Sequence, residues 1–311
     1  MKKAILFLIL INSITINYAQ DWFTSLEVAK KLALVQDKML FVMWEESMKY
    51  DYQVIMYDEN GNGVVVKISK DEFIENLIWE NFVPVLLPEY TYPELSKNVK
   101  ETKGVKYYNK LIDDNIKIMD VNGNILNIDD SLNKYDEKYY FSYLDFADFI
   151  KRYALNTSFM RQEFENYVKE KNFNTAFNLA SKYLDYAIIV QNDLKPEIIA
   201  MANIYFDEAK TYLKQGYVDN SLAIYQRLEL MKFKEELILN KTKKLLKQLK
   251  KLDEEPIDKT NESLFNFLNY TTFKLLNKEE SAELWKNKVS SIDLTLSEMI
   301  LNNIIEIGNN N

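Results

Sequence analysis

Residues 39–50, MLFVMWEESMKY, set the fold that we expect for the first half of this 311-residue chain. The opening run, MLFVM, is entirely apolar, which is typical of a short buried strand. Trp44 follows that run, and the mostly polar segment Glu45–Lys49 comes directly after it. We therefore expect a core strand with Trp44 at its end and a polar segment immediately behind it.

This segment resembles the thioredoxin family, in which the corresponding strand ends in the motif Trp-Cys-x-x-Cys-Lys. Trp44 and Lys49 stand at the two ends of that motif, and Glu45 and Met48 occupy the positions of its two cysteines. In the family, the first cysteine reacts as a low-pKa thiolate at the N-terminus of a helix. The resemblance implies a thioredoxin-like frame without its nucleophile, and therefore no redox activity.

The composition also excludes thiol chemistry, because the chain contains neither cysteine nor histidine. Thiol–disulfide exchange, Cys–His pairs, Ser-His-Asp triads and the common Cys/His zinc sites all need one of these residues. With 39 Lys and Arg against 47 Asp and Glu, the chain is mildly acidic, which disfavours general nucleic-acid binding. We expect no metal, no cofactor and no nucleic-acid partner.

The N-terminus has the pattern of a secretory signal peptide. Lys2 and Lys3 precede an apolar run over residues 4–11, and polar and small residues lead to Ala19. The run is too short to span a membrane, and no second run of membrane-spanning length follows. We expect a signal peptide over residues 1–19 and an exported mature chain, periplasmic or extracellular, without a membrane span.

The following elements arrive in the order of the thioredoxin frame, and the resemblance covers residues 20–155. Apolar residues at helical spacing predict helices over residues 21–37, 69–82 and 139–155. The run FVPVLL predicts a second core strand over residues 82–87.

Three further positions can be compared with the family's later strand pair, which carries the pattern Pro-Thr-x-x-x-x-Asp-x-x-Gly. Asp120 and Gly123 match the end of that pattern, whereas Asp114 stands in the cis-proline position. In the family, that proline lies beside the cysteines and shapes the groove for peptide substrates. The resemblance therefore implies an altered groove as well as a lost nucleophile.

Residues 52–68 look like an insertion relative to the family. Two β-rich runs flank the sequence DENGNG of residues 58–63, whose two Asn-Gly steps predict a β-hairpin. Because it follows the vacant motif directly, we expect this hairpin to cover the site as a lid. Asp58, Asn60 and Asn62 also match the opening of a calcium loop, but Ser69 at the twelfth position and the flanking strands favour a plain turn.

A carboxylate-based enzyme is the alternative. Glu45 and Glu46 follow the strand, and the thioredoxin frame would bring Asp113 and Asp114 near them, where the carboxyl groups could act as acid and base. Since the chain holds 47 carboxylate residues, solvated charges at loop ends are the simpler interpretation.

Residues 156–311 carry helical periodicity without strand signals. Two stretches, residues 167–184 and 212–228, resemble tetratricopeptide repeats, but their 45-residue spacing differs from the usual 34, so a plain helical bundle remains an alternative. Either form could bind peptides on a helical face. Tyr205 and Tyr217, on or next to the better repeat-like pair, are the candidate partner-binding residues.

Residues 240–252 form a basic amphipathic stretch with six lysines. Such a helix could lie on an anionic membrane or polymer. Three acidic residues follow at once, which favours a solvated helix face.

The sequence therefore predicts an α+β chain in two parts, a thioredoxin-like α/β domain over residues 20–155 and an all-α domain over residues 156–311. We expect an exported, cysteine-free protein that binds other proteins or peptides, as a chaperone or scaffold of the cell envelope. The alternative is a non-redox enzyme that uses the carboxylates near the former active-site loop.

Overall fold

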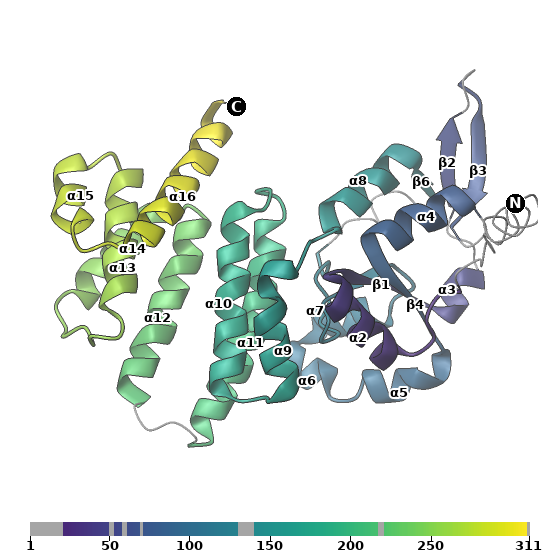
Figure 1. Ribbon diagram of the computed structural model, residues 1–311, viewed down its shortest axis with the longest axis horizontal. Helices are drawn as coiled ribbons and strands as arrows, with labels where there is room; N and C mark the ends of the chain where they lie inside the picture. Colours follow the sequence, from purple (N-terminus) through teal and green to yellow (C-terminus); the bar gives the residue numbers. More distant parts are fainter. Residues whose placement is uncertain are drawn as a thin grey trace, which may run out of the picture.

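The structure, a computed structural model, describes residues 21–49, 53–57, 61–68, 71–129, 140–216 and 221–309. The predicted signal peptide, the calcium-loop residues Asp58 and Asn60, and Tyr217 lie outside the described residues. Mixed α/β structure comes first and helices alone make up the rest, as predicted (Figure 1). No described helix is long and apolar enough to cross a membrane.

The first part contains strands and mostly short helices. In chain order they are α2 (Leu26–Gln36), β1 (Met39–Trp44), α3 (Glu45–Lys49), β2 (Gln53–Tyr57), β3 (Gly63–Lys67), α4 (Glu72–Asn81), β4 (Phe82–Leu87), η1 (Glu89–Thr91), α5 (Tyr92–Leu95), α6 (Val99–Lys103), α7 (Val105–Ile112), β5 (Lys117–Met119), β6 (Tyr140–Ser142) and α8 (Tyr143–Tyr153).

The second part is helical. Its elements are η3 (Ser158–Met160), α9 (Arg161–Lys169), α10 (Phe173–Ile189), α11 (Lys195–Lys214), α12 (Ser221–Ile238), α13 (Thr242–Leu252), α14 (Glu262–Leu275), α15 (Glu279–Lys286) and α16 (Ser291–Asn309).

The central sheet is built around β1. This strand pairs in parallel with β4 and antiparallel with β5, and all six of its residues are buried. Burial on both faces explains why its sequence is continuously apolar rather than alternating. Single bridges extend the sheet on both sides, from Phe23 to Val85 and from Met119 to Ile125. Phe41, at the centre of β1, contacts the rings of Phe82 and of Phe149 on α8.

The predicted hairpin is present, but the lid is not. β2 and β3 pair antiparallel from Gln53↔Lys67 to Tyr57↔Gly63, and the other edge of β2 pairs in parallel with β6. Figure 1 shows the hairpin pointing away from α3, at the far side of α4. The expectation of a lid is therefore wrong, because pairing with β6 holds β2 beside α8 instead of over Trp44.

Two helices begin later in the chain than the sequence predicts. Over residues 139–155, the first described residues form β6 and the helix begins only after Ser142, whose hydroxyl accepts a hydrogen bond from the Asp145 amide. The helix expected from Ser69 is capped by Asp71, whose carboxylate accepts from the Ile74 amide. In both places a side-chain oxygen that satisfies a free amide sets the helix start.

The helical part consists of successive antiparallel helices packed side by side (Figure 1). The repeat-like stretches correspond to α9 with α10 and to α11 with α12, two helix pairs, each joined by a short connection. A capping box between Asn172 and Thr175 starts α10. Three helices, α14, α15 and α16, complete the chain at its C-terminal end.

The two parts share one continuous hydrophobic core. Asp37, in a left-handed conformation after α2, accepts a hydrogen bond from the Thr157 amide through its carbonyl and forms an ion pair with Arg161 on α9. Arg152 on α8 bonds Asp193 and Glu197, at 2.6 and 2.9 Å. Polar contacts therefore join the sheet part to the start of the helical part at more than one place.

Candidate functional site

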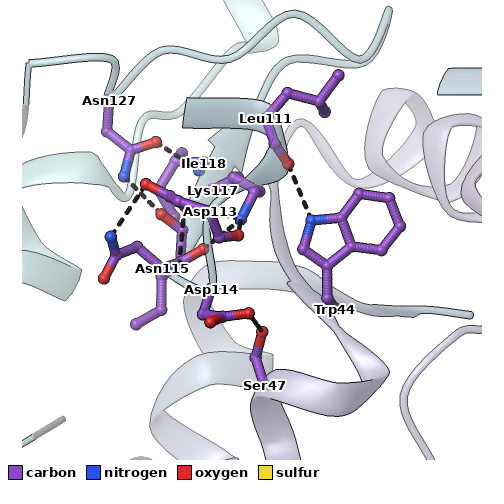
Figure 2. Close-up of polar contacts among 10 residues, drawn as sticks. Trp44, Ser47, Leu111, Asp113, Asp114, Asn115, Lys117, Ile118 and Asn127 are labelled. Atoms are coloured by element: carbon purple, nitrogen blue, oxygen red, sulfur yellow. Dashed lines mark hydrogen bonds and ion pairs between the residues drawn. The ribbon is translucent and has the colours of Figure 1, made fainter. Parts of the chain in front are cut away.

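Trp44 is the last residue of β1, and its side chain contacts Leu111 and Tyr92. Its indole nitrogen donates a hydrogen bond to the Leu111 carbonyl at 2.8 Å (Figure 2). The centre of its ring lies 5.7 Å from that of the Tyr92 ring. The side chain is buried. Trp44 therefore contributes to the core and ties α7 to the end of β1.

Glu45 and Met48, which the sequence comparison aligned with the family's two cysteines, differ in exposure. Glu45 is exposed at the start of α3, whereas Met48 packs against the hydrophobic core. Glu46 is exposed too, and its amide donates to the Glu89 carboxylate at 3.2 Å. Lys49 ends α3, and its side chain lies outside what the structure describes.

Ser47 connects α3 to the loop that carries Asp114. Its hydroxyl is almost fully buried and donates to the Asp114 carboxylate at 3.3 Å (Figure 2). Asp114, the exposed residue that the sequence comparison placed at the cis-proline position, thus lies beside α3. Ser47 is not among the residues that the sequence pattern singles out.

Lys117, on β5, also binds this loop. This β5 side chain has no exposed surface, and its ammonium donates to the Asp113 carboxylate at 3.0 Å and to the Asn115 carbonyl at 2.6 Å. Asp113 also accepts two hydrogen bonds from Asn115, each 2.9 Å long. Burial lowers the pKa of Lys117 to about 8, although the neighbouring Asp113 carboxylate opposes that change.

The sequence carries one signal for this lysine, which the family comparison does not reveal. Lys117 is the single charged residue in the apolar strand IKIM, where a buried charge requires a partner. Asn127 supports the same strand, because its amide group bonds the Ile118 nitrogen and the Ile116 carbonyl (Figure 2).

Together these contacts bond the loop of residues 113–115 to α3 and to β5. Asp113 binds Lys117 and Asn115, and Asp114 accepts a hydrogen bond from Ser47. Glu45 and Glu46 are exposed to solvent. Of the four carboxylates considered for catalysis, the structure therefore places two at the surface of α3 and ties the other two into the neighbouring loop. No group of three or more Asp or Glu side chains among the described residues is arranged to hold a metal ion.

A second polar cluster lies between the sheet part and the helical part. The fully buried Asp120 carboxylate accepts hydrogen bonds from the amides of Asn122 and Asn124, both at 2.9 Å. From the helical part, the hydroxyls of Tyr183 on α10, at 3.0 Å, and of Tyr205 on α11 donate to the same carboxylate. Four donors therefore satisfy one buried charge.

Tyr205 is placed at the centre of this cluster. Its hydroxyl also accepts from the side-chain amides of Asn122 and Asn124, at 2.9 and 2.8 Å, and its ring stacks on Tyr183. Burial, reinforced by the Asp120 charge, raises the pKa of both tyrosines well above the usual value. Tyr205 is 0 % exposed, so it is not a surface anchor for a partner. The prediction failed because helical spacing alone does not show that the face carrying Tyr205 packs against the sheet part.

Comparison with known proteins gives no further guidance, since no protein-family model, curated protein or solved structure matches this chain.

Proposed function

We propose that this protein is a non-redox, thioredoxin-like binding protein of the cell envelope that holds other proteins through its helical part. The strand order supports the thioredoxin-like interpretation. The Phe23 bridge, β4, β1, β5 and the Ile125 bridge follow one another across the sheet, with α3 directly after β1. Fold resemblance alone does not assign an activity, so the function is argued from the site.

One observation carries the proposal: the loop region where the family does its chemistry is filled by its own contacts. Trp44 is bonded to Leu111, and Ser47 is bonded to Asp114. Beside them, the Lys117 ammonium is enclosed by acceptors from Asp113 and Asn115. A catalytic acid–base pair needs groups that reach a substrate together. Here Asp113 is bonded to Lys117 and Asn115 and Asp114 to Ser47, while Glu45 and Glu46 are exposed on α3. This arrangement favours a binding role over a carboxylate enzyme.

The helical part supplies exposed side chains of the kind that anchor protein partners. Leu222 and Tyr225 lie three residues apart on the first turns of α12 and are 82 % and 52 % exposed. Residues at this spacing occupy one face of a helix, and exposed aromatic and aliphatic side chains are common anchors at protein interfaces. We propose this pair as the partner contact in place of Tyr205.

The test is in-cell crosslinking of the full chain followed by identification of the captured proteins. The double variant Leu222→Ser/Tyr225→Ser should lose captured partners. Its control, Val35→Ser/Leu144→Ser, removes two exposed apolar side chains from the sheet part and should retain them. Loss of partners in a Glu45→Gln/Glu46→Gln variant, with the helical variant unaffected, would move the binding site to α3.

A second measurement addresses redox activity. With no cysteine in the chain, the purified protein should not reduce insulin disulfides above background. Turnover in this assay would contradict the assignment.

A further inference from the structure

The outer face of α13 carries a row of lysines. The helix buries Leu245, Leu249 and Leu252 among its neighbours, which include α12 and α14. On the opposite side, the exposed side chains are Lys243, Lys247, Lys250 and Lys251. At 100° per residue these four positions fall within an arc of about 100°, so they form one stripe along the helix.

The helix itself, TKKLLKQLKKL, contains no acidic residue, although the chain carries a net charge of −8. Other lysines of the helical part pair with acids, including Lys244 of α13 itself, which bonds Glu236 at 2.5 Å. Within the described residues, the four stripe lysines take part in no ion pair. Two of the spacings, 243 to 247 and 247 to 251, also place like charges one turn apart, which disfavours a helix. An external anion would relieve this repulsion.

We propose that the stripe is an electrostatic contact for a bilayer with anionic lipid headgroups. A lysine ammonium is a flexible point charge without the fixed geometry that recognises one particular anion. Such groups suit a field of many headgroup phosphates, each lysine adding to the attraction near the surface. A helix also touches a plane along a line, so the four side chains can reach the headgroups together.

The burial of the leucines defines how α13 would meet the bilayer. Because the apolar face is already packed inside the protein, the helix rests on the headgroups and does not insert. α13 belongs to the end of the molecule opposite the sheet (Figure 1). Asp253, Glu254 and Glu255 follow the helix and are exposed, so they would weaken the contact at its C-terminal end.

The test is co-sedimentation of the full chain with vesicles of phosphatidylcholine alone or mixed with phosphatidylglycerol. We expect binding only to the anionic vesicles, decreasing as salt is added. Replacing Lys243, Lys247, Lys250 and Lys251 by Gln should lower the affinity by about tenfold or more. The variant Glu254→Gln/Glu255→Gln should raise it.

The matched control replaces four exposed lysines elsewhere, Lys97, Lys100, Lys169 and Lys214, by Gln. It changes the net charge by the same amount and should bind anionic vesicles clearly better than the stripe variant, with circular dichroism confirming that both are folded. Equal binding to neutral vesicles, or equal loss in the two variants, would overturn the proposal. Binding to soluble heparin without binding to anionic vesicles would overturn it as well and indicate a polyanionic polymer.

Discussion

At the level of single residues, the hydrogen bonds around Asp120 predict that Tyr205 contributes more to stability than Tyr183. Tyr205→Phe removes a donor to a buried carboxylate and also leaves the side-chain amides of Asn122 and Asn124 without their acceptor. Tyr183→Phe removes only one donor, at 3.0 Å. We expect the unfolding free energy to fall by about 3 kcal/mol for Tyr205→Phe and by about 2 kcal/mol for Tyr183→Phe.

Urea denaturation measures both changes. Tyr225→Phe, at a half-exposed position, is the control and should change the free energy by less than about 0.5 kcal/mol. A larger loss for Tyr183→Phe than for Tyr205→Phe would show that Tyr205 is not the centre of the cluster.

Lys117 predicts a pH dependence of stability. Its pKa is about 8 in the folded protein against 10.5 for an ordinary lysine, so the unfolded state binds more protons between these two values. The contribution of Lys117 to the unfolding free energy should therefore rise with pH across that window, by up to about 3 kcal/mol.

The measurement compares urea denaturation of the wild type and Lys117→Met at several pH values. The other titrating groups are common to both proteins, so the difference between them reports Lys117. The exposed Lys100→Met variant should follow the wild type at every pH. Parallel pH curves for the wild type and Lys117→Met would contradict the lowered pKa of Lys117 in the folded protein.

At the level of elements, α10 depends on its capping box. The Asn172 side chain accepts from the Thr175 amide at 3.0 Å, and the Thr175 hydroxyl accepts from the Asn172 amide at 3.1 Å. Asn172→Ala should lower the unfolding free energy by about 1 kcal/mol, because it leaves a helix-terminal amide unpaired. The neighbouring Asn174→Ala is the control, since this exposed side chain makes no capping bond and alanine favours a helix. Equal effects in thermal or urea denaturation would exclude a capping contribution.

At the level of the whole molecule, the shared core predicts that both parts unfold together. In a Trp285→Phe variant, tryptophan fluorescence comes only from Trp22, Trp44 and Trp79 in the sheet part. Far-ultraviolet circular dichroism mainly follows the helical part, and the two urea transitions should coincide. Adding Asp120→Ala should separate them, because that change removes the carboxylate that bonds α10 and α11 to the sheet part. Separate transitions before Asp120 is changed would mean that the parts are independent.

This coupling also changes how partner binding should be studied. From the sequence, a fragment of residues 156–311 would be expected to keep the partners on its own. In the structure, such a fragment would expose Tyr183 and Tyr205, whose hydroxyls bond Asp120 of the sheet part. Point variants of the full chain are therefore the better test.

The local elements of this protein could be predicted from its sequence. The apolar run of β1 indicated a short buried strand, the Asn-Gly steps indicated the hairpin, and 3.6-residue periodicity indicated the final helices. These features follow from neighbouring residues, because strand and helix periods fix which side of an element is apolar. The lack of cysteine and histidine likewise excluded thiol chemistry without any structure.

Only the tertiary structure shows what each face of a helix or strand packs against. Tyr205 meets Asp120 across 85 positions of sequence, Ser47 meets Asp114 across 67, and β2 pairs with β6 instead of covering Trp44. Periodicity marks a buried face but does not name its neighbour, so an exposed anchor and a core tyrosine look alike in the sequence. The buried charges of Asp120 and Lys117 are stable only because several distant groups converge on them, and that convergence is a property of the tertiary structure.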